Sequence, residues 1–136
     1  MNADQYRQYV ACFNGRDYDG LHAFFAEDVV LQVSGYEIRG KSGIARFYEF
    51  FHDHVRETVT VRRFVEGGDL DFADVVIRFE GLKELTAERL ASEGFAKMMP
   101  VPAGATVEIA LFIAYGSRAG KIEVIRCAIF EPPLPE

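Results

Sequence analysis

His52 and His54 stand near the end of the predicted helix IARFYEFFHDHV, and their imidazole rings could move protons near neutral pH. Two positions apart on a helix, the rings face different directions, so a shared metal ion is not expected. His54 follows Phe47 by seven residues and Phe51 by three, which brings it within reach of a pocket mouth. His54 is therefore the candidate general base, and the alternative is a surface histidine that caps helix carbonyls.

Cys127 is the candidate nucleophile, but its surroundings favour a structural role. It alternates with Ile125 and Ile129 in KIEVIRCAIF, and the sequence supplies no adjacent base. The acidic stretch GGDLDFAD from Gly67 lacks the glutamate spacing of a calcium loop and is more typical of a hairpin turn. No metal site is predicted.

The first half of the chain supplies helices that could position these side chains. Asn2 or Asp4 can cap a first helix that ends at Asn14 and Gly15, and Asp17 can cap a short second helix. After a strand at 29–33 and a turn leading to 36–38, Gly40 opens a third helix. The apolar faces of the three helices are expected to be Tyr6, Tyr9, Val10 and Phe13; then Tyr18, Leu21 and Phe25; then Ile44, Phe47, Tyr48 and Phe51.

Beyond Glu57 the pattern becomes that of strands, predicted at 58–66, 70–80, 107–115 and 121–130. Helices followed by strands indicate an α+β fold in which three helices pack on a long, curved antiparallel sheet. The segment 82–104 is a long connection with a short helix from Thr86 to Ser92, and such connections often form binding loops or lids. We expect one domain over residues 1–136, with this segment as an insertion.

Composition narrows the possible partners. The net charge of −6 argues against a nucleic-acid partner, and Arg62 and Arg63 are the only adjacent basic pair. The apolar run IALFIAY is far shorter than the roughly 20 residues of a membrane span. The N-terminus lacks a secretory pattern and the two cysteines lie far apart, which favours a reduced, cytoplasmic protein. The tail EPPLPE is expected to be extended or disordered.

Three stretches resemble a known group of proteins. YVACFNGRDYDGLHAFFAEDVVLQ, IRGKSGIARFYEFF and YGSRAGKIEVIRCAIF are similar to the nuclear transport factor 2-like, or cystatin-like, superfamily, and within it to the SnoaL-like polyketide cyclases and the ketosteroid isomerases. MPVPAGATVEI resembles a loop-and-strand region of the SnoaL-like proteins. The resemblance covers nearly the whole chain and implies a cone-shaped barrel with an apolar mouth.

The resemblance also assigns residues to the ketosteroid isomerase site, in which an aspartate is the base and a tyrosine and a protonated aspartate hold the oxyanion. It places Tyr9 at the oxyanion tyrosine, Tyr48 at a supporting tyrosine and Phe25 at the third tyrosine position. The base and the second acid fall on Val33 and Leu111, which are apolar. Steroid isomerisation by that route is therefore not expected.

SnoaL-type cyclases also resemble this scaffold, and they rely on an acid in the cavity. Asp74, Glu108 and Glu123 are the candidate acids, and the sequence does not place any of them inward. The pocket is expected to have Tyr9 and Tyr48 as its polar groups, which suits a hydrophobic ligand with a carbonyl or hydroxyl. Its expected lining is Phe13, Phe25, Leu31, Val33, Phe47, Phe51, Ile77, Leu111, Ile125 and Cys127.

Three functions are compatible with these residues. The leading hypothesis is a cofactor-independent isomerase, cyclase or lyase for a steroid-, polyketide- or terpenoid-like compound, with Tyr9 donating a hydrogen bond to its oxygen. The alternatives are a binding protein without chemistry and a dimeric scaffold with a filled core. Homodimerisation through the sheet is expected, because the last two strands have a second apolar face. That face consists of Ala110, Phe112, Ala114, Val124, Ala128 and Phe130.

Overall fold

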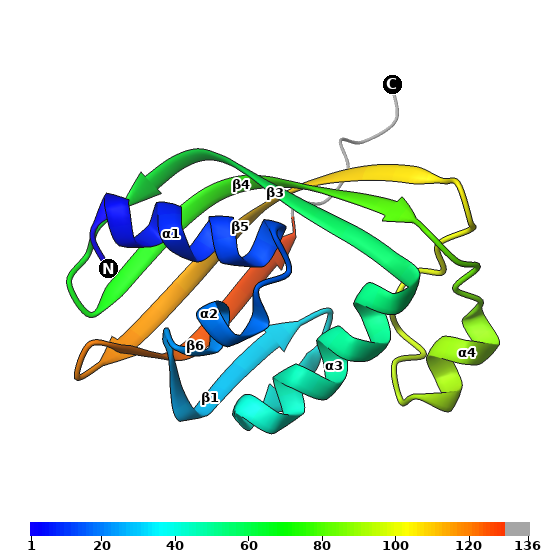
Figure 1. The fold of residues 1–136 in the computed structure, drawn as a ribbon, viewed down its shortest axis with the longest axis horizontal. Helices are drawn as coiled ribbons and strands as arrows, with labels where there is room; N and C mark the ends of the chain where they lie inside the picture. Colours follow the sequence, from blue (N-terminus) through cyan, green and yellow to red (C-terminus); the bar gives the residue numbers. More distant parts are fainter. Residues whose placement is uncertain (130–136) are drawn as a thin grey trace.

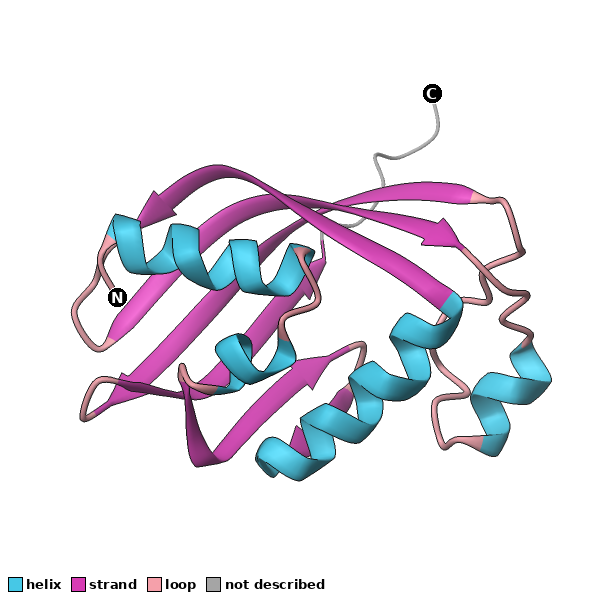
Figure 2. Cartoon of the chain, viewed as in Figure 1, coloured by secondary structure: helices cyan, strands magenta, loops and turns pink. Residues whose placement is uncertain are grey.

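Six strands form one curved sheet in the order β2-β1-β6-β5-β4-β3, and helices α1, α2 and α3 lie along its concave face (Figures 1 and 2). The computed structural model describes residues 1–129, so Phe130 and the tail EPPLPE lie outside the described part. The elements are α1 (Ala3–Asn14), α2 (Tyr18–His22), β1 (Phe25–Val33), β2 (Tyr36–Arg39), α3 (Gly40–His54), β3 (Val55–Val65), β4 (Leu70–Gly81), α4 (Ala87–Ser92), β5 (Thr106–Arg118) and β6 (Lys121–Ile129).

The predicted α+β class, with three helices on a curved sheet, is confirmed. Neighbouring strands are antiparallel except for β1 and β6, which run parallel. The predicted caps are also present: Asn2 forms a capping box with Gln5 at the start of α1, and Asp17 caps α2. Because Tyr6, Tyr9 and Phe13 are buried, α1 packs its aromatic face onto the sheet.

Two boundaries differ from the sequence prediction. Phe25 does not extend the face of α2 but opens β1, since the carbonyl oxygen of Phe24 already accepts a hydrogen bond from the Ile122 amide of β6. The third helix ends at His54, and Val55 is extended at once, with φ −133° and ψ 132°. Strand β3 therefore begins three residues earlier than the predicted start at Thr58, which places Glu57 inside the sheet.

The end of α3 and strand β3 are stabilised by side chains from the end of α1 and from the residues that follow it. The Arg16 guanidinium donates to the carbonyl oxygen of His52 at 2.9 Å and to that of Val55 at 3.3 Å. The Asn14 side chain donates to the Val59 carbonyl at 2.9 Å and accepts from the Val59 amide at 2.8 Å. These side chains supply partners for backbone groups that the helix end and the edge strand leave open.

The insertion forms a separate lobe at one end of the sheet, where α4 lies beyond the end of β4 (Figure 1). Backbone hydrogen bonds between Leu85 and Val101, at 2.9 and 3.0 Å, close its base. No helix among residues 1–129 is long and apolar enough to cross a membrane.

Candidate functional site

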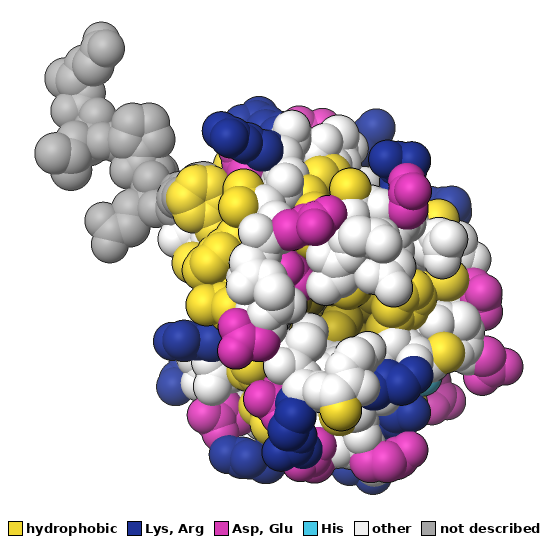
Figure 3. Space-filling view, turned by 90° about the vertical axis from the view of Figure 1, so that its left-hand side faces the viewer, with side chains coloured by type: hydrophobic (Ala, Val, Ile, Leu, Met, Phe, Trp, Pro, Cys, Tyr) yellow, Lys and Arg dark blue, Asp and Glu magenta, His cyan; other side chains and the backbone are white. Residues whose placement is uncertain are grey.

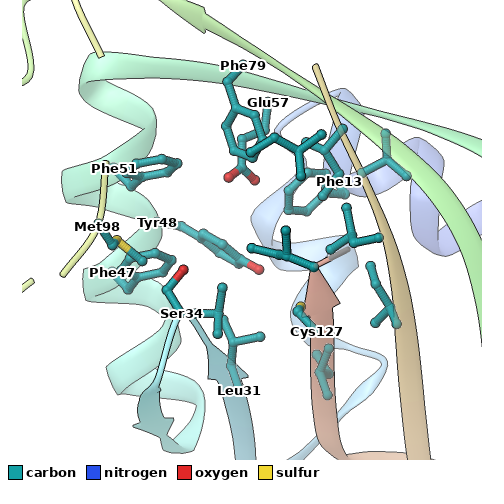
Figure 4. A pocket seen from close by; sticks show the side chains of 18 of the residues that line it. Phe13, Leu31, Ser34, Phe47, Tyr48, Phe51, Glu57, Phe79, Met98 and Cys127 are labelled. Atoms are coloured by element: carbon teal, nitrogen blue, oxygen red, sulfur yellow. The ribbon is translucent and has the colours of Figure 1, made fainter. Parts of the chain in front are cut away.

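A cavity of about 370 Å³ lies between the concave face of the sheet, α1, α3 and the insertion. Its presence contradicts the reading of the domain as a scaffold with a filled core. Most of the predicted lining residues do surround it, and several are shown in Figure 4. They are Phe13, Leu31, Val33, Phe47, Phe51, Ile77, Leu111, Ile125 and Cys127.

Tyr9 and Tyr48 also line the cavity, and both remain protonated at neutral pH. Burial raises the pKa of each phenol well above its ordinary value, and nearby phenols add to the rise. The Glu57 carboxylate is a further cause at Tyr48. Among residues 1–129 neither hydroxyl has a hydrogen-bond partner, so both can donate to a ligand.

Phe25 and His54 do not line this cavity. Phe25 is buried at the start of β1, where its ring packs edge-on against Tyr9 and His22, with centroids 6.2 and 5.3 Å away. The Nδ1 atom of His54 lies 2.9 Å from the carbonyl oxygen of Phe50, one helical turn back. This is the helix-capping arrangement, and it directs the His54 ring away from the position of a cavity base.

The acid that faces the cavity is Glu57, a residue that the sequence reasoning missed. It comes from β3, only 12% of its side chain is exposed, and its carboxylate points into the cavity as does the Tyr48 hydroxyl (Figure 4). The predicted acids Asp74, Glu108 and Glu123 are absent from the lining. Glu123 instead pairs with Arg118 at 3.3 Å on the outside.

His52 contacts one oxygen of the Glu57 carboxylate. The His52 side chain is buried, and its Nε2 lies 3.3 Å from Oε2 of Glu57. Its Nδ1 lies 2.7 Å from the hydroxyl of Tyr18, and its ring stacks on Tyr48 with centroids 4.8 Å apart. Because Oε1 of Glu57 has no hydrogen-bond partner among residues 1–129, that oxygen is available to a ligand.

Cys127 has the character of a buried thiol. Burial, and secondarily the Glu57 carboxylate, raise the pKa of Cys127 to about 12, so the thiol form prevails at neutral pH. A thiol this weakly ionised is a poor nucleophile, in line with the structural role favoured by its sequence. Within residues 1–129, no group of three or more histidine, cysteine, aspartate or glutamate side chains could hold a metal ion.

The sequence matches the model of the SnoaL-like domain over residues 6–124, which is most of the chain. The chain belongs to the SnoaL-like domain family. A comparison of this SnoaL-like domain with curated proteins finds no match.

Solved structures share the fold of this SnoaL-like domain at low sequence identity. A candidate polyketide cyclase of Pseudomonas putida KT2440 is 21% identical with a TM-score of 0.75, covering 90% of this chain and 86% of that one. A Mycobacterium tuberculosis protein in complex with estradiol-17β-hemisuccinate is 22% identical with a TM-score of 0.66, covering 90% and 88%. An M. tuberculosis epoxide hydrolase of the LEH-like kind is 14% identical with a TM-score of 0.68, covering 92% and 79%.

In this SnoaL-like domain the insertion forms part of the cavity wall through Lys97, Met98 and Val101, with other residues. Phe95 packs against Phe47 of α3 at 5.1 Å and against Tyr36 of β2 at 5.3 Å between ring centroids. The Lys97 amide donates to the Tyr36 hydroxyl at 2.8 Å. These contacts join the insertion to α3 and to β2.

Proposed function

We propose that this protein is a cofactor-independent isomerase, cyclase or lyase that acts on a hydrophobic carbonyl compound of steroid-, polyketide- or terpenoid-like size. The observation that carries the proposal is one free carboxylate oxygen, that of Glu57, facing an apolar cavity that also contains the unpartnered hydroxyl of Tyr48. A base and a hydrogen-bond donor in one apolar cavity are the groups needed to form an enolate.

In the proposed step, Oε1 of Glu57 removes a proton from the carbon beside the substrate carbonyl. The electrons of that C–H bond become the enolate, whose oxygen accepts a hydrogen bond from Tyr48. In an isomerisation, Glu57 then returns the proton to a different carbon. In a cyclisation, the enolate carbon attacks a second carbonyl of the substrate, and Glu57 gives the proton to the alkoxide that forms. In a lyase reaction, the enolate expels a leaving group, and Glu57 gives the proton to that group. Each outcome conserves protons and needs no redox partner.

Tyr48 is the preferred donor for an oxygen close to Glu57, since the Glu57 carboxylate raises the pKa of Tyr48 but is not among the causes at Tyr9. The main causes at Tyr9 beyond its burial are Tyr6 and Cys127. Tyr9 is therefore assigned to a second oxygen of the ligand, deeper against α1 and β5. This division modifies the expectation from the sequence, in which Tyr9 held the reacting oxygen.

The competing candidate is a binding protein without chemistry. It is favoured by the apolar lining of the cavity and by the M. tuberculosis relative of similar fold that was solved with a steroid ester. Native mass spectrometry of freshly purified protein, followed by organic extraction, would identify a molecule that remains bound through purification. Such a molecule also defines which relatives should be tested for turnover.

The decisive experiment compares proton exchange in wild type, Glu57→Gln and Glu49→Gln. Glu49 is an exposed glutamate on α3 and serves as the matched control. The probes are a β,γ-unsaturated ketosteroid and an aromatic β-diketone in D₂O, followed by mass spectrometry. We expect Glu57→Gln to slow exchange beside the carbonyl by about 10²-fold or more, the usual contribution of a general base, with Glu49→Gln unaffected. Equal rates in all three proteins would refute the role of Glu57.

We also propose a homodimer that packs through the outer face of the sheet. On that face Phe72 lies opposite Ala114 and Phe112 lies opposite Ala128, and Phe72 and Phe112 are 46% and 47% exposed. Hydrophobic side chains reach the surface along that side of the molecule (Figure 3). Light scattering should give twice the mass of one chain, and Phe72→Asp should lower it. A wild-type monomer at high concentration would contradict the proposal.

A further inference from the structure

Lys97 is the one basic side chain in the cavity wall among residues 1–129, and Glu57 is the one acidic side chain there. Each of the other three lysines has an oxygen partner for its ammonium. These pairs are Lys41 with Glu27, Lys83 with Asp53, and Lys121 with the carbonyl oxygen of Ala23. The Lys97 ammonium has no oxygen partner among residues 1–129, so it is available to an anionic group of a ligand.

Two contacts hold Lys97 beside the hairpin of β1 and β2, although the residue is exposed. Its backbone amide donates to the Tyr36 hydroxyl at 2.8 Å, and its Nζ lies over the Tyr36 ring, 5.5 Å from the centroid. A cation over an aromatic face is attracted by the electrons of the ring. The turn that contains Lys97 is closed by a hydrogen bond of 3.0 Å from the Met98 amide to the Phe95 carbonyl oxygen. The ammonium is therefore held against the hairpin.

Ser34 supplies a second polar group on this side of the cavity. It is the first residue of the two-residue turn between β1 and β2, with φ 51°, and Gly35 follows with φ 79°. Two consecutive positive φ values are the mark of a tight hairpin turn. The Ser34 hydroxyl lines the cavity, points toward α3 and has no hydrogen-bond partner among residues 1–129 (Figure 4). Nζ of Lys97 is close to the same turn, because a Cβ added to Gly35 would lie 3.9 Å from it.

The basic and acidic side chains of the cavity come from different sides of the sheet. Lys97 contacts β2 and Glu57 belongs to β3, and these two strands are the opposite ends of the strand order. In the view of Figure 4, Ser34 and Glu57 lie on opposite sides of Tyr48. An anion is attracted by Lys97 and repelled by an ionised Glu57. The net charge of −6 also opposes anions over the protein as a whole, so Lys97 provides a local exception.

We propose that Lys97 and Ser34 form a carboxylate-binding site and that the substrate is a hydrophobic oxo acid. This inference rests on the proposed roles of Glu57 and Tyr48 and adds the chemical class of the substrate. The Lys97 ammonium and the Ser34 hydroxyl donate to the carboxylate, the apolar body fills the cavity, and the ketone oxygen accepts from Tyr48. The carbon beside the ketone then faces Glu57. One ammonium and one hydroxyl suit a carboxylate, whereas a phosphate dianion calls for several donors such as arginine.

The first test measures binding alone and needs no turnover. The probes are pyrenebutyrate and its uncharged amide, pyrenebutyramide, whose fluorescence is titrated with the full chain. We expect the wild type to bind the acid about two- to fivefold more tightly than the amide, as an exposed ion pair allows. Lys97→Gln should remove the preference. Lys83→Gln, which changes another lysine of the insertion outside the cavity wall, should keep it.

Charge reversal distinguishes an ion pair from a change in shape. Lys97→Glu should bind pyrenebutylamine more tightly than pyrenebutyrate, which is the reverse of the wild-type order. Because salt screens exposed charges, an ionic strength of about 0.5 M should reduce both preferences. Equal affinity of the wild type for the acid and the amide would overturn the site. The same conclusion would follow if pyrenebutyrate did not bind or if Lys97→Glu still preferred it.

The second test joins the carboxylate to the reaction. Naphthoylpropionate and its methyl ester carry the same ketone, and their exchange of hydrogen beside it is followed in D₂O by mass spectrometry. We expect Lys97→Gln to lower kcat/KM for the acid about two- to fivefold and to leave the ester unchanged, because only the acid can pair with Lys97. An equal loss for acid and ester would assign the effect to packing and overturn the site.

These outcomes separate the carboxylate site from the proposed function. If Glu57→Gln exchanges as fast as wild type while Lys97→Gln removes the preference for pyrenebutyrate, the carboxylate site stands and the proposed function is wrong. If Glu57→Gln slows exchange while Lys97→Gln changes neither binding nor kcat/KM, the base stands and the carboxylate site is wrong.

Discussion

Cys127 should report the charge of Glu57, because the two side chains share the cavity. Burial and the Glu57 carboxylate raise the pKa of Cys127 from 9.0 to about 12, which extends the thiol form to higher pH. At pH 8 the thiolate fraction then falls from ~10⁻¹ to ~10⁻⁴, since each pH unit below the pKa costs a factor of ten. We expect alkylation to be about a thousandfold slower than at an ordinary thiol, before any effect of limited access.

The assay is alkylation by iodoacetamide between pH 7 and 10, with the Cys127 peptide quantified by mass spectrometry. The rate should rise about tenfold per pH unit across this range without reaching a plateau, as expected for a thiol titrating above it. Restricted access lowers the rate at every pH but does not move the midpoint, so the shape of the profile separates the two causes.

Glu57→Gln removes the second cause of the raised pKa and should increase the rate at fixed pH, whereas Glu49→Gln on the exposed side of α3 should not. Circular dichroism checks that the variants remain folded. A wild-type plateau near pH 9 would show that the thiol is not desolvated. Identical profiles for wild type and Glu57→Gln would show that the Glu57 carboxylate does not raise the pKa of Cys127.

Two further predictions concern Asn14, which bonds to β3, and Lys97, which lines the cavity. Asn14→Ala removes two hydrogen bonds to the backbone of Val59 and should lower the free energy of unfolding in urea by about 2–4 kcal/mol. A loss below about 0.5 kcal/mol for Asn14→Ala would mean that water replaces both bonds. Lys97 lines the cavity and has no ion-pair partner among residues 1–129, so a hydrophobic ligand that carries a carboxylate should bind about two- to fivefold more tightly than its uncharged analogue, as an exposed ion pair allows. Lys97→Gln should abolish that difference, and its persistence would assign the preference to other residues.

The fold could be predicted because each element carries a strong local signal. The aromatic stripe of α1, its Asn2 cap and the alternation of the late strands all survive in the structure. The apolar lining was predictable for the same reason, since alternation sends Leu111, Ile125 and Cys127 to one side of the sheet. The insertion was recognisable by its length, but its contacts with Tyr36 join distant parts of the chain and leave no local pattern.

Sequence reasoning missed Glu57 because it placed the boundary between the third helix and the next strand too late in the chain. The sequence HVRETVT can continue a helix or open a strand, and the predicted strand began after Glu57. The structure ends α3 at His54, where Arg16 from the other side of the domain supplies donors to the helix end. That tertiary contact cannot be read from local periodicity. With the boundary misplaced, Glu57 falls outside the predicted strand, and His54 is the predicted base in place of His52.

The position of Glu57 has a consequence for how a substrate must lie. The resemblance to ketosteroid isomerases places the base on β1, where Val33 stands, whereas the acid here comes from β3. Strands β1 and β3 are separated in the sheet by β6, β5 and β4, so the curved sheet brings them to opposite walls of the cavity. Tyr48 remains on α3 between these walls. In the proposed reaction, a substrate whose oxygen bonds Tyr48 turns the carbon that loses its proton toward β3, away from Val33. Moving the acid back by Val33→Asp with Glu57→Gln should then change which carbon is deprotonated, and unchanged regiochemistry would refute this orientation.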